Sequence, residues 1–159
     1  MVGYLPNHPV AIAAFLATNS IGAVWSCCSP DFGVESVISR LGQLNPVIFI
    51  GMREYSYNGK KYNLSDRIKL IQKEIPTIEF VLYFETGFES WNLETNDITS
   101  LESVAVEYDH PIWVLYSSGT TGKPKAITHR TGGILMEQYK AIALHQNLKT
   151  EDRFFWHTS

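Results

Sequence analysis

The chain contains only two cysteines, seven prolines and no long apolar run among its 159 residues. Cys27 and Cys28 are adjacent, so they cannot join distant segments through a disulfide, and a reducing, cytoplasmic setting is expected. No stretch approaches the roughly 18 consecutive apolar residues of a membrane span, and the polar stretch 6–8 interrupts any leader-like run. We therefore expect a soluble, cytoplasmic protein that does not bind a membrane.

Neither sign of charge dominates. The 13 Lys and Arg residues against 16 Asp and Glu give a formal net charge of -3, which offers a nucleic-acid backbone little attraction. The 45% hydrophobic share is typical of a globular protein and argues against disorder, collagen or a coiled coil. The chain has about the length of one domain, which is enough to bury a core.

The apolar residues alternate between helical and strand spacing along the first half of the chain. Helices are predicted over 8–17, 34–41 and 64–75, and strands over 23–27, 47–50 and 80–84. Asn58-Gly59 predicts a loop or hairpin turn within 52–62. Helix and strand in this alternation are typical of an α/β fold with a mostly parallel sheet and crossover helices. The helix at 8–17 is apolar nearly all round, so we expect it to be buried between layers.

The second half begins with a polar stretch, 85–109, that is expected to be an exposed connection. A strand over 112–116 and a returning strand over 126–129 are predicted on either side of a glycine-rich segment. The apolar positions of 134–144 predict a helix with a core-facing stripe. Three tryptophans lie inside apolar runs and are expected in the core: Trp25, Trp113 and Trp156.

The segment Ser117–Lys125, which we call the candidate loop, carries the most chemistry. Its glycines, Gly119 and Gly122, let main-chain N–H groups approach a ligand. It also has four hydroxyls and two ammonium groups, and no acidic side chain: Ser117, Ser118, Thr120, Thr121, Lys123 and Lys125. A loop made of donors alone suits a polyphosphate, because charge-assisted bonds are the stronger ones. The same residue types are also common in ordinary exposed turns, and composition alone does not separate the two interpretations.

Two well-known nucleotide motifs are excluded. In the Walker A motif four residues separate the glycines and Ser or Thr follows the lysine, whereas here two residues separate Gly119 from Gly122 and Pro124 follows Lys123. No G-x-G-x-x-G dinucleotide motif is present. The candidate loop also connects two predicted strands rather than leading into a helix.

The sequence Tyr116–Ala126 resembles, position by position, the phosphate-loop signature of the adenylate-forming superfamily, which includes acyl-CoA synthetases, luciferases and peptide-synthetase adenylation domains. Within that superfamily the chain is similar from end to end to the acetoacetyl-CoA synthetases. The segments that carry this narrower resemblance are 3–7, 21–26, 29–33, 57–60, His129, 132–134 and 152–156. The Ser29–Gly33 segment is the part that favours the acetoacetate branch.

The resemblance implies an acid–thiol ligase that works in two steps. Acetoacetate would attack the α-phosphorus of ATP to give acetoacetyl-AMP and pyrophosphate, and the thiol of CoA would then displace AMP. Residues 117–122 of the candidate loop would wrap the β- and γ-phosphates, while Lys123 and Lys125 would offset the charge on the departing pyrophosphate. ATP, CoA and Mg²⁺ are thus the implied cofactors, and the Mg²⁺ ligands are expected outside these 159 residues.

The same resemblance implies that residues 1–159 are part of an N-terminal AMP-binding domain whose C-terminal partner domain is absent. Elements that the family uses for adenine, ribose, Mg²⁺ and the substrate carboxylate are not found, so the fragment alone is expected to be inactive. Two alternatives stay open: a nucleotide-binding fragment or isoform without catalysis, and a ligase for another short acyl or aryl acid.

Four further residues have an ordinary structural interpretation beside a functional one. Asp31 could lie near a CoA tunnel, but a cap of the next helix is favoured. Cys27 and Cys28 have no basic neighbour to lower a thiol pKa and are expected to be buried and unreactive. His129 could approach the nucleotide or simply pack. The histidines have no carboxylate or thiol partner at ligand spacing, so no structural metal site is expected.

Overall fold

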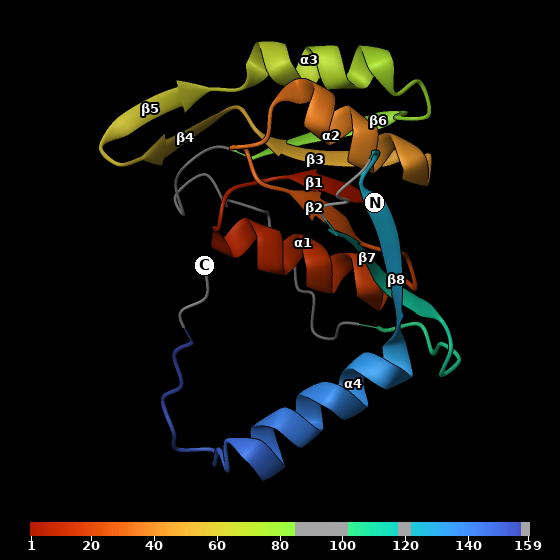
Figure 1. Cartoon of the computed structure of the whole chain (residues 1–159), viewed down its shortest axis with the longest axis vertical. Coiled ribbons are helices and arrows are strands. Elements are labelled where there is room, and N and C mark those ends of the chain that lie inside the picture. Colours follow the sequence, from red (N-terminus) through yellow and green to blue (C-terminus); the bar gives the residue numbers. More distant parts are fainter. Residues whose placement is uncertain (85–101, 118–121, 157–159) are drawn as a thin grey trace.

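A four-stranded parallel sheet forms the centre of the molecule (Figure 1). The computed structural model describes residues 1–84, 102–117 and 122–156. The sheet has the order β2-β1-β3-β6, with β1 at Val2–Tyr4, β2 at Ser26–Cys28, β3 at Ile48–Met52 and β6 at Phe80–Phe84. All three strand pairs are parallel. The predicted α/β class with a mostly parallel sheet is confirmed.

Helices cover both faces of this sheet, as crossover connections require (Figure 1). The helix α1, Pro9–Ser20, lies on one face, and α2, Val34–Leu41, and α3, Ser65–Glu74, lie on the other. A 3₁₀ turn, η1, follows α2 at Gly42–Leu44. Each face has its own apolar cluster, one around Val37 and Ile68, the other around Val10. The result is a three-layer arrangement that leaves one face of the edge strand β6 uncovered, with Phe80 58% and Leu82 47% exposed.

The helix α1 is less buried than its composition suggests. Pro9 begins the helix, where its missing N–H costs nothing, and the backbone N–H of Val10 donates to Nδ1 of His8 at 3.2 Å. Its buried positions follow one face, at Val10, Ala14 and Thr18. The opposite face is exposed, 61% at Ile12 and 58% at Leu16. The expectation of a helix buried all round is therefore wrong, because the apolar residues outnumber the positions that the sheet covers.

The polar stretch after β3 forms the predicted hairpin. Strand β4, Glu54–Tyr57, pairs with β5, Lys60–Asn63, in an antiparallel register. Asn58 and Gly59 connect the strands with positive φ angles of 49° and 74°. Two such residues in succession are the signature of a type I′ turn, whose twist matches that of the flanking strands.

A second two-stranded ribbon carries the candidate loop. Strand β7, Pro111–Ser117, pairs antiparallel with β8, Lys125–Arg130. The ribbon is fixed to the central sheet next to β2. The N–H of Val114 donates to the carbonyl of Trp25 at 2.8 Å, and the buried hydroxyl of Ser26 donates to the carbonyl of Val114 at 2.7 Å. In Figure 1 the ribbon runs along one side of the molecule from the level of α2 to the start of α4.

The helical segment after β8 stands away from the sheet (Figure 1). It consists of α4, Thr131–Lys140, and a π-helical turn, η3, at Ala141–His145. None of their residues is buried, and the side chains of Tyr139 and Leu144 are 75% and 76% exposed. The predicted helix is confirmed, but its core-facing stripe is not: periodic apolar spacing predicts a face and not what covers it. None of the helices that the structure describes is long and apolar enough to cross a membrane.

The three tryptophans expected in the core differ in how deeply they are buried. Trp25 is buried and Trp113 is partly buried, whereas Trp156 is 63% exposed, so the expectation is wrong for Trp156. Trp156 lies in a segment without regular structure. Among the described residues its ring contacts that of Phe154, with the ring centroids 6.2 Å apart.

Candidate functional site

The candidate loop lies at one end of the β7–β8 ribbon. Its described residues are Ser117, Gly122, Lys123, Pro124 and Lys125, while Ser118, Gly119, Thr120 and Thr121 lie outside the residues that the structure describes. Ser117 pairs with Lys125 as the last register position of the ribbon. The structure thus brings one predicted hydroxyl and one predicted ammonium group opposite each other at the base of the loop.

The described residues of the loop leave their ligand-binding groups accessible. The side chains of Ser117, Lys123 and Lys125 are exposed. Among the described residues, no atom lies within 4 Å of a Cβ added at Gly122, so none of them fills the space on that side of the backbone. Neither lysine forms an ion pair in the part of the chain that the structure covers, whose salt bridges all lie elsewhere. Two ammonium groups without a carboxylate partner can both be directed at an anion.

Two hydrogen bonds fix this end of the ribbon to the last turn of α2 and to η1, residues 39–43, which we call the α2–η1 corner. The hydroxyl of Tyr116 donates to the carbonyl of Arg40 at 2.6 Å. The amide of Gln43 donates to the carbonyl of Pro124 at 3.1 Å and to that of Ser39 at 2.6 Å. Burial raises the pKa of Tyr116 to about 12, so this hydroxyl keeps its proton at neutral pH.

A hollow of about 470 Å³ adjoins the loop at this corner. Its lining residues are Glu35, Ile38, Ser39, Gly42, Gln43 and Lys123. The Lys123 side chain therefore borders an open space and is not packed into the core. The corner was not predicted, because Gln43 belongs to no motif and the partners of Gln43 and Tyr116 are distant in the sequence. Tyr116 is the first position of the loop signature, but the signature does not indicate its contact with Arg40.

His129 packs within the ribbon. Its ring meets that of Trp113 edge-on, with the centroids 5.9 Å apart. The Nδ1 atom of His129 and the Nε1 atom of Trp113 are both buried without a hydrogen-bond partner among the described residues. Of the two interpretations left open by the sequence, the structure favours packing.

The other candidate residues have structural roles. Asp31 does not cap α2, whose N-cap is Gly33, so that expectation is wrong. Its carboxylate instead accepts hydrogen bonds from the hydroxyls of Ser29, at 3.0 Å, and Tyr55, at 3.4 Å. Cys28 is buried and Cys27 partly buried; burial raises the pKa of Cys27 to about 12 and that of Cys28 to about 11. The expectation of buried thiols is confirmed for Cys28 and in part for Cys27, and the raised pKa disfavours the nucleophilic thiolate at both.

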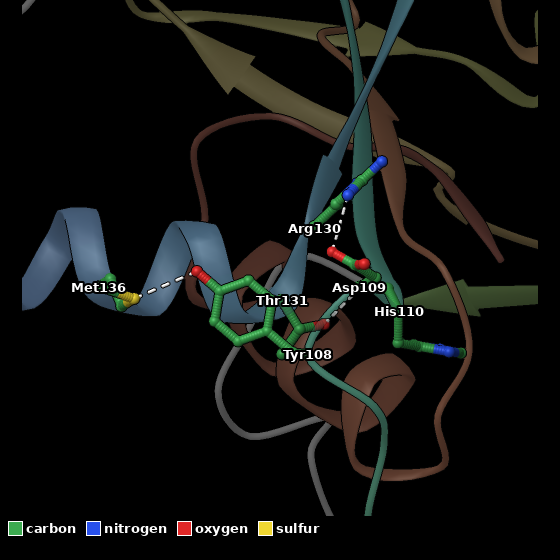
Figure 2. Close-up of polar contacts among 6 residues, drawn as sticks. All are labelled: Tyr108, Asp109, His110, Arg130, Thr131 and Met136. Atoms are coloured by element: carbon green, nitrogen blue, oxygen red, sulfur yellow. Dashed lines mark hydrogen bonds and ion pairs between the residues drawn. The ribbon is translucent and has the colours of Figure 1, made fainter.

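The opposite end of the ribbon meets α4 in a junction formed by residues 108–110 and 130–136 (Figure 2). The Arg130 guanidinium forms an ion pair with Asp109 at 2.7 Å. The hydroxyl and the backbone N–H of Thr131 both donate to the carbonyl of His110, each at 2.8 Å. His110 in turn contacts the carbonyl of Gly22 through Nε2 at 2.9 Å. We call this region the α4 junction.

Tyr108 lies at the centre of the α4 junction (Figure 2). Its hydroxyl contacts the Met136 sulfur at 3.1 Å, and its carbonyl accepts from the N–H of Gly132 at 2.9 Å. A Cβ at Gly132 would overlap the Tyr108 ring, whereas one at Gly133 would meet nothing within 4 Å. Only the first of the two neighbouring glycines is therefore required by space.

The sequence matches the AMP-binding enzyme family over residues 2–159, and the chain belongs to that family. It is 35% identical to the acetoacetyl-coenzyme A synthetase of Rhizobium meliloti, in an alignment that covers 98% of this chain. It superimposes on the acetoacetyl-CoA synthetase from Streptomyces lividans with a TM-score of 0.90 and 42% identity over 99% of the chain. It is also 32% identical over its whole length to the malonamoyl-CoA synthetase vrtB of Penicillium aethiopicum.

The chain spans about a quarter of the length of these relatives: 26% of the Rhizobium and Streptomyces proteins and 25% of the Penicillium one. The resemblance stated from the sequence, to the adenylate-forming superfamily and to the acetoacetyl-CoA synthetases within it, is confirmed as a similarity over the whole chain.

Proposed function

We propose that this chain is part of the large N-terminal domain of an ATP-dependent acid–thiol ligase. Its preferred acid is acetoacetate, which reacts with ATP to give acetoacetyl-AMP and pyrophosphate before CoA displaces AMP. The observation that carries the proposal is a set of exposed donors at the described ends of the loop, in a chain that is similar from end to end to acetoacetyl-CoA synthetases. Their two ammonium groups form no ion pair among the described residues.

In this proposal the candidate loop binds the pyrophosphate half of ATP. The hydroxyls of Ser117, Ser118, Thr120 and Thr121 and the amides of Gly119 and Gly122 supply neutral donors. Lys123 and Lys125 supply charge. No described residue fills the Cβ side of Gly122, which supports this role, since a phosphate must approach the backbone closely there.

The two lysines act by electrostatic stabilisation. When the carboxylate of the acid attacks the α-phosphorus, the bond to the bridging oxygen of pyrophosphate breaks, and negative charge accumulates on the leaving group. Ammonium groups that are already positioned around that group lower the barrier without forming a covalent bond. Their lack of carboxylate partners in the described part of the chain means that no competing ion pair has to be broken first.

Mg²⁺ and CoA complete the proposed reaction. When bound, Mg²⁺ would neutralise phosphate charge and CoA would supply the thiol that takes the acyl group. No group of three or more metal-ligating side chains occurs within 1–84, 102–117 and 122–156. The residues of these ranges fit the anionic phosphates of ATP through Lys123 and Lys125, and we assign the Mg²⁺ ligands to other parts of the protein.

A second candidate function is supported by the similarity to a malonamoyl-CoA synthetase. The same adenylation chemistry would then act on another short acid with a polar group beyond the carboxylate. A third, binding of nucleotide without catalysis, would use the same loop. These functions differ in which acid, if any, releases pyrophosphate.

The test is ATP–pyrophosphate exchange, measured on the protein expressed from the complete reading frame that carries this chain. Acetoacetate, malonamate, acetate and propionate are compared at equal concentration. We expect the highest ratio of kcat to KM with acetoacetate. Faster exchange with malonamate would move the assignment to the second function, and Mg·ATP binding without exchange for any acid would leave only the third.

A further inference from the structure

The two lysines of the candidate loop flank a residue that is held from outside the loop. Pro124 lies between Lys123 and Lys125 and has no N–H, so its carbonyl is its only backbone hydrogen-bonding group. That carbonyl accepts from the side-chain amide of Gln43 at 3.1 Å. The other hydrogen of the same amide is directed to the carbonyl of Ser39, at 2.6 Å. Gln43 thus connects the last turn of α2 to the backbone between the lysines.

The facing strand is held at the same place. Tyr116 pairs with Ala126 across the ribbon, and its hydroxyl donates to the carbonyl of Arg40 at 2.6 Å. The Arg40 carbonyl also accepts from the N–H of Gly42, and its second lone pair is available to the Tyr116 hydroxyl. The α2–η1 corner therefore contacts the ribbon on both sides of Lys125. It binds Pro124, the residue before Lys125, and Tyr116, the strand partner of Ala126, which is the residue after Lys125.

The helix that carries the corner is anchored in the core. Val37 and Leu41 of α2 are fully buried in the core against α3 and the sheet, both at 0% exposure. Neither Lys123 nor Lys125 forms an ion pair among the described residues. The position of each side chain therefore depends on the backbone that carries it.

From this arrangement we infer that Gln43 and Tyr116 are positioning residues for the pyrophosphate-binding lysines. They fix the backbone that carries Lys123 and Lys125 before the ligand arrives. The inference rests on the proposed function, since it assigns the two lysines to the pyrophosphate of ATP. Neither Gln43 nor Tyr116 needs to touch the ligand.

Positioning in advance reduces the ordering cost that the ligand must otherwise overcome. Removing one hydrogen bond should therefore weaken binding of the phosphates in the ground state and in the transition state equally. Such a loss of uniform binding raises KM for ATP and leaves kcat unchanged. One hydrogen bond of ordinary strength corresponds to a factor of about five in an equilibrium constant.

The test uses Gln43→Met, which keeps the length of the side chain and removes both donors, and Tyr116→Phe, which removes one hydroxyl. Gln72→Met on the exposed face of α3 is the matched control. Binding of magnesium pyrophosphate and of Mg·ATP is measured by calorimetry on the complete protein. ATP–pyrophosphate exchange supplies kcat and the KM values of ATP and acetoacetate, and the melting temperature is recorded.

We expect each of the two variants to bind magnesium pyrophosphate about fivefold more weakly than wild type and to show a matching rise in KM for ATP. The kcat, the KM for acetoacetate and the melting temperature should stay close to those of the control. Wild-type affinity for pyrophosphate in Gln43→Met would overturn the inference and leave the proposed function standing. A parallel rise in both KM values with a lower melting temperature would also overturn it, since the residues would then be merely structural. A wild-type protein that binds neither ligand would overturn the proposed function, and the inference with it.

Discussion

The two ends of the β7–β8 ribbon are built in opposite ways. At the α4 junction a glycine is required because the Tyr108 ring fills the space beside it, and the polar groups of Asp109, Arg130 and Thr131 are all paired. At the loop end no described residue fills the Cβ side of Gly122, and the ammonium groups of two lysines have no ion-pair partner among the described residues.

We infer from this difference that one end of the ribbon contributes to the stability of the fold and the other end to ligand binding. Packed contacts and paired polar groups stabilise the folded chain, and their loss is felt in the free energy of unfolding. Exposed, unpaired charges contribute little to folding and remain available to a ligand. Substitutions at the α4 junction should therefore change stability, and those in the candidate loop should change activity alone.

The largest effect is expected from Lys125→Ala. Loss of one charged group that stabilises the departing pyrophosphate should lower kcat for ATP–pyrophosphate exchange about 100-fold, as loss of one preorganised donor does elsewhere. The melting temperature should stay nearly unchanged, because the side chain is exposed and unpaired. Exchange kinetics and thermal melting of the complete protein measure the two quantities.

Lys61→Ala is the matched control for that substitution. Lys61 is an exposed lysine in the strand β5, so the change in net charge is the same and the site is different. A Lys125→Ala variant that melts several degrees lower than Lys61→Ala would show that the loop end is structural, and the contrast between the two ends would be lost.

The next effect concerns the two neighbouring glycines of α4. Gly132→Ala should destabilise the protein by about 2 kcal/mol, because the new methyl group overlaps the Tyr108 ring and the helix or the ring must shift. Gly133→Ala should be neutral or stabilising by up to about 1 kcal/mol, since the space is open and alanine favours a helix. Denaturant unfolding compares them, and equal effects at both positions would contradict the close packing at the junction.

Local sequence patterns were enough to predict most of the elements but not what covers them. The hairpin at Asn58-Gly59 was predicted because two residues with positive φ define the turn by themselves. Strand β1 was missed because three residues, one of them Gly3, are too few to display a period. The burial expected for 134–144 was wrong because an apolar stripe does not reveal its partner.

The candidate site likewise has one part that the sequence predicts and one part that it does not. The loop was found because its chemistry lies in consecutive residues, from Ser117 to Lys125. Its supports at the α2–η1 corner were not, because the Tyr116 bond joins residues 76 apart and the Gln43 bond joins residues 81 apart in the sequence. Such pairs carry no local signal, and only the folded chain brings them together.

A smaller effect should be visible at high pH. Burial raises the pKa of Tyr116 to about 12, above the ordinary value of 10 for an unfolded chain, so the folded state favours the protonated phenol. The stability from this preference is fully present below pH 10 and is lost as the pH rises toward 12. The melting temperature of Tyr116→Phe should therefore fall less than that of wild type between these pH values. Parallel curves would place the hydroxyl in solvent.

The smallest effect is expected from Asp109→Asn at the α4 junction. The ion pair with Arg130 is short, at 2.7 Å, but both side chains are about two-thirds exposed, at 67% and 65%. Solvent and salt screen such a pair, so its loss should cost about 0.5 kcal/mol at low ionic strength and less at 1 M salt. Unfolding at two salt concentrations measures this. A salt-independent loss of 2 kcal/mol or more would mean that the charge pair, rather than the fit of Tyr108 against Gly132, holds α4 to the ribbon.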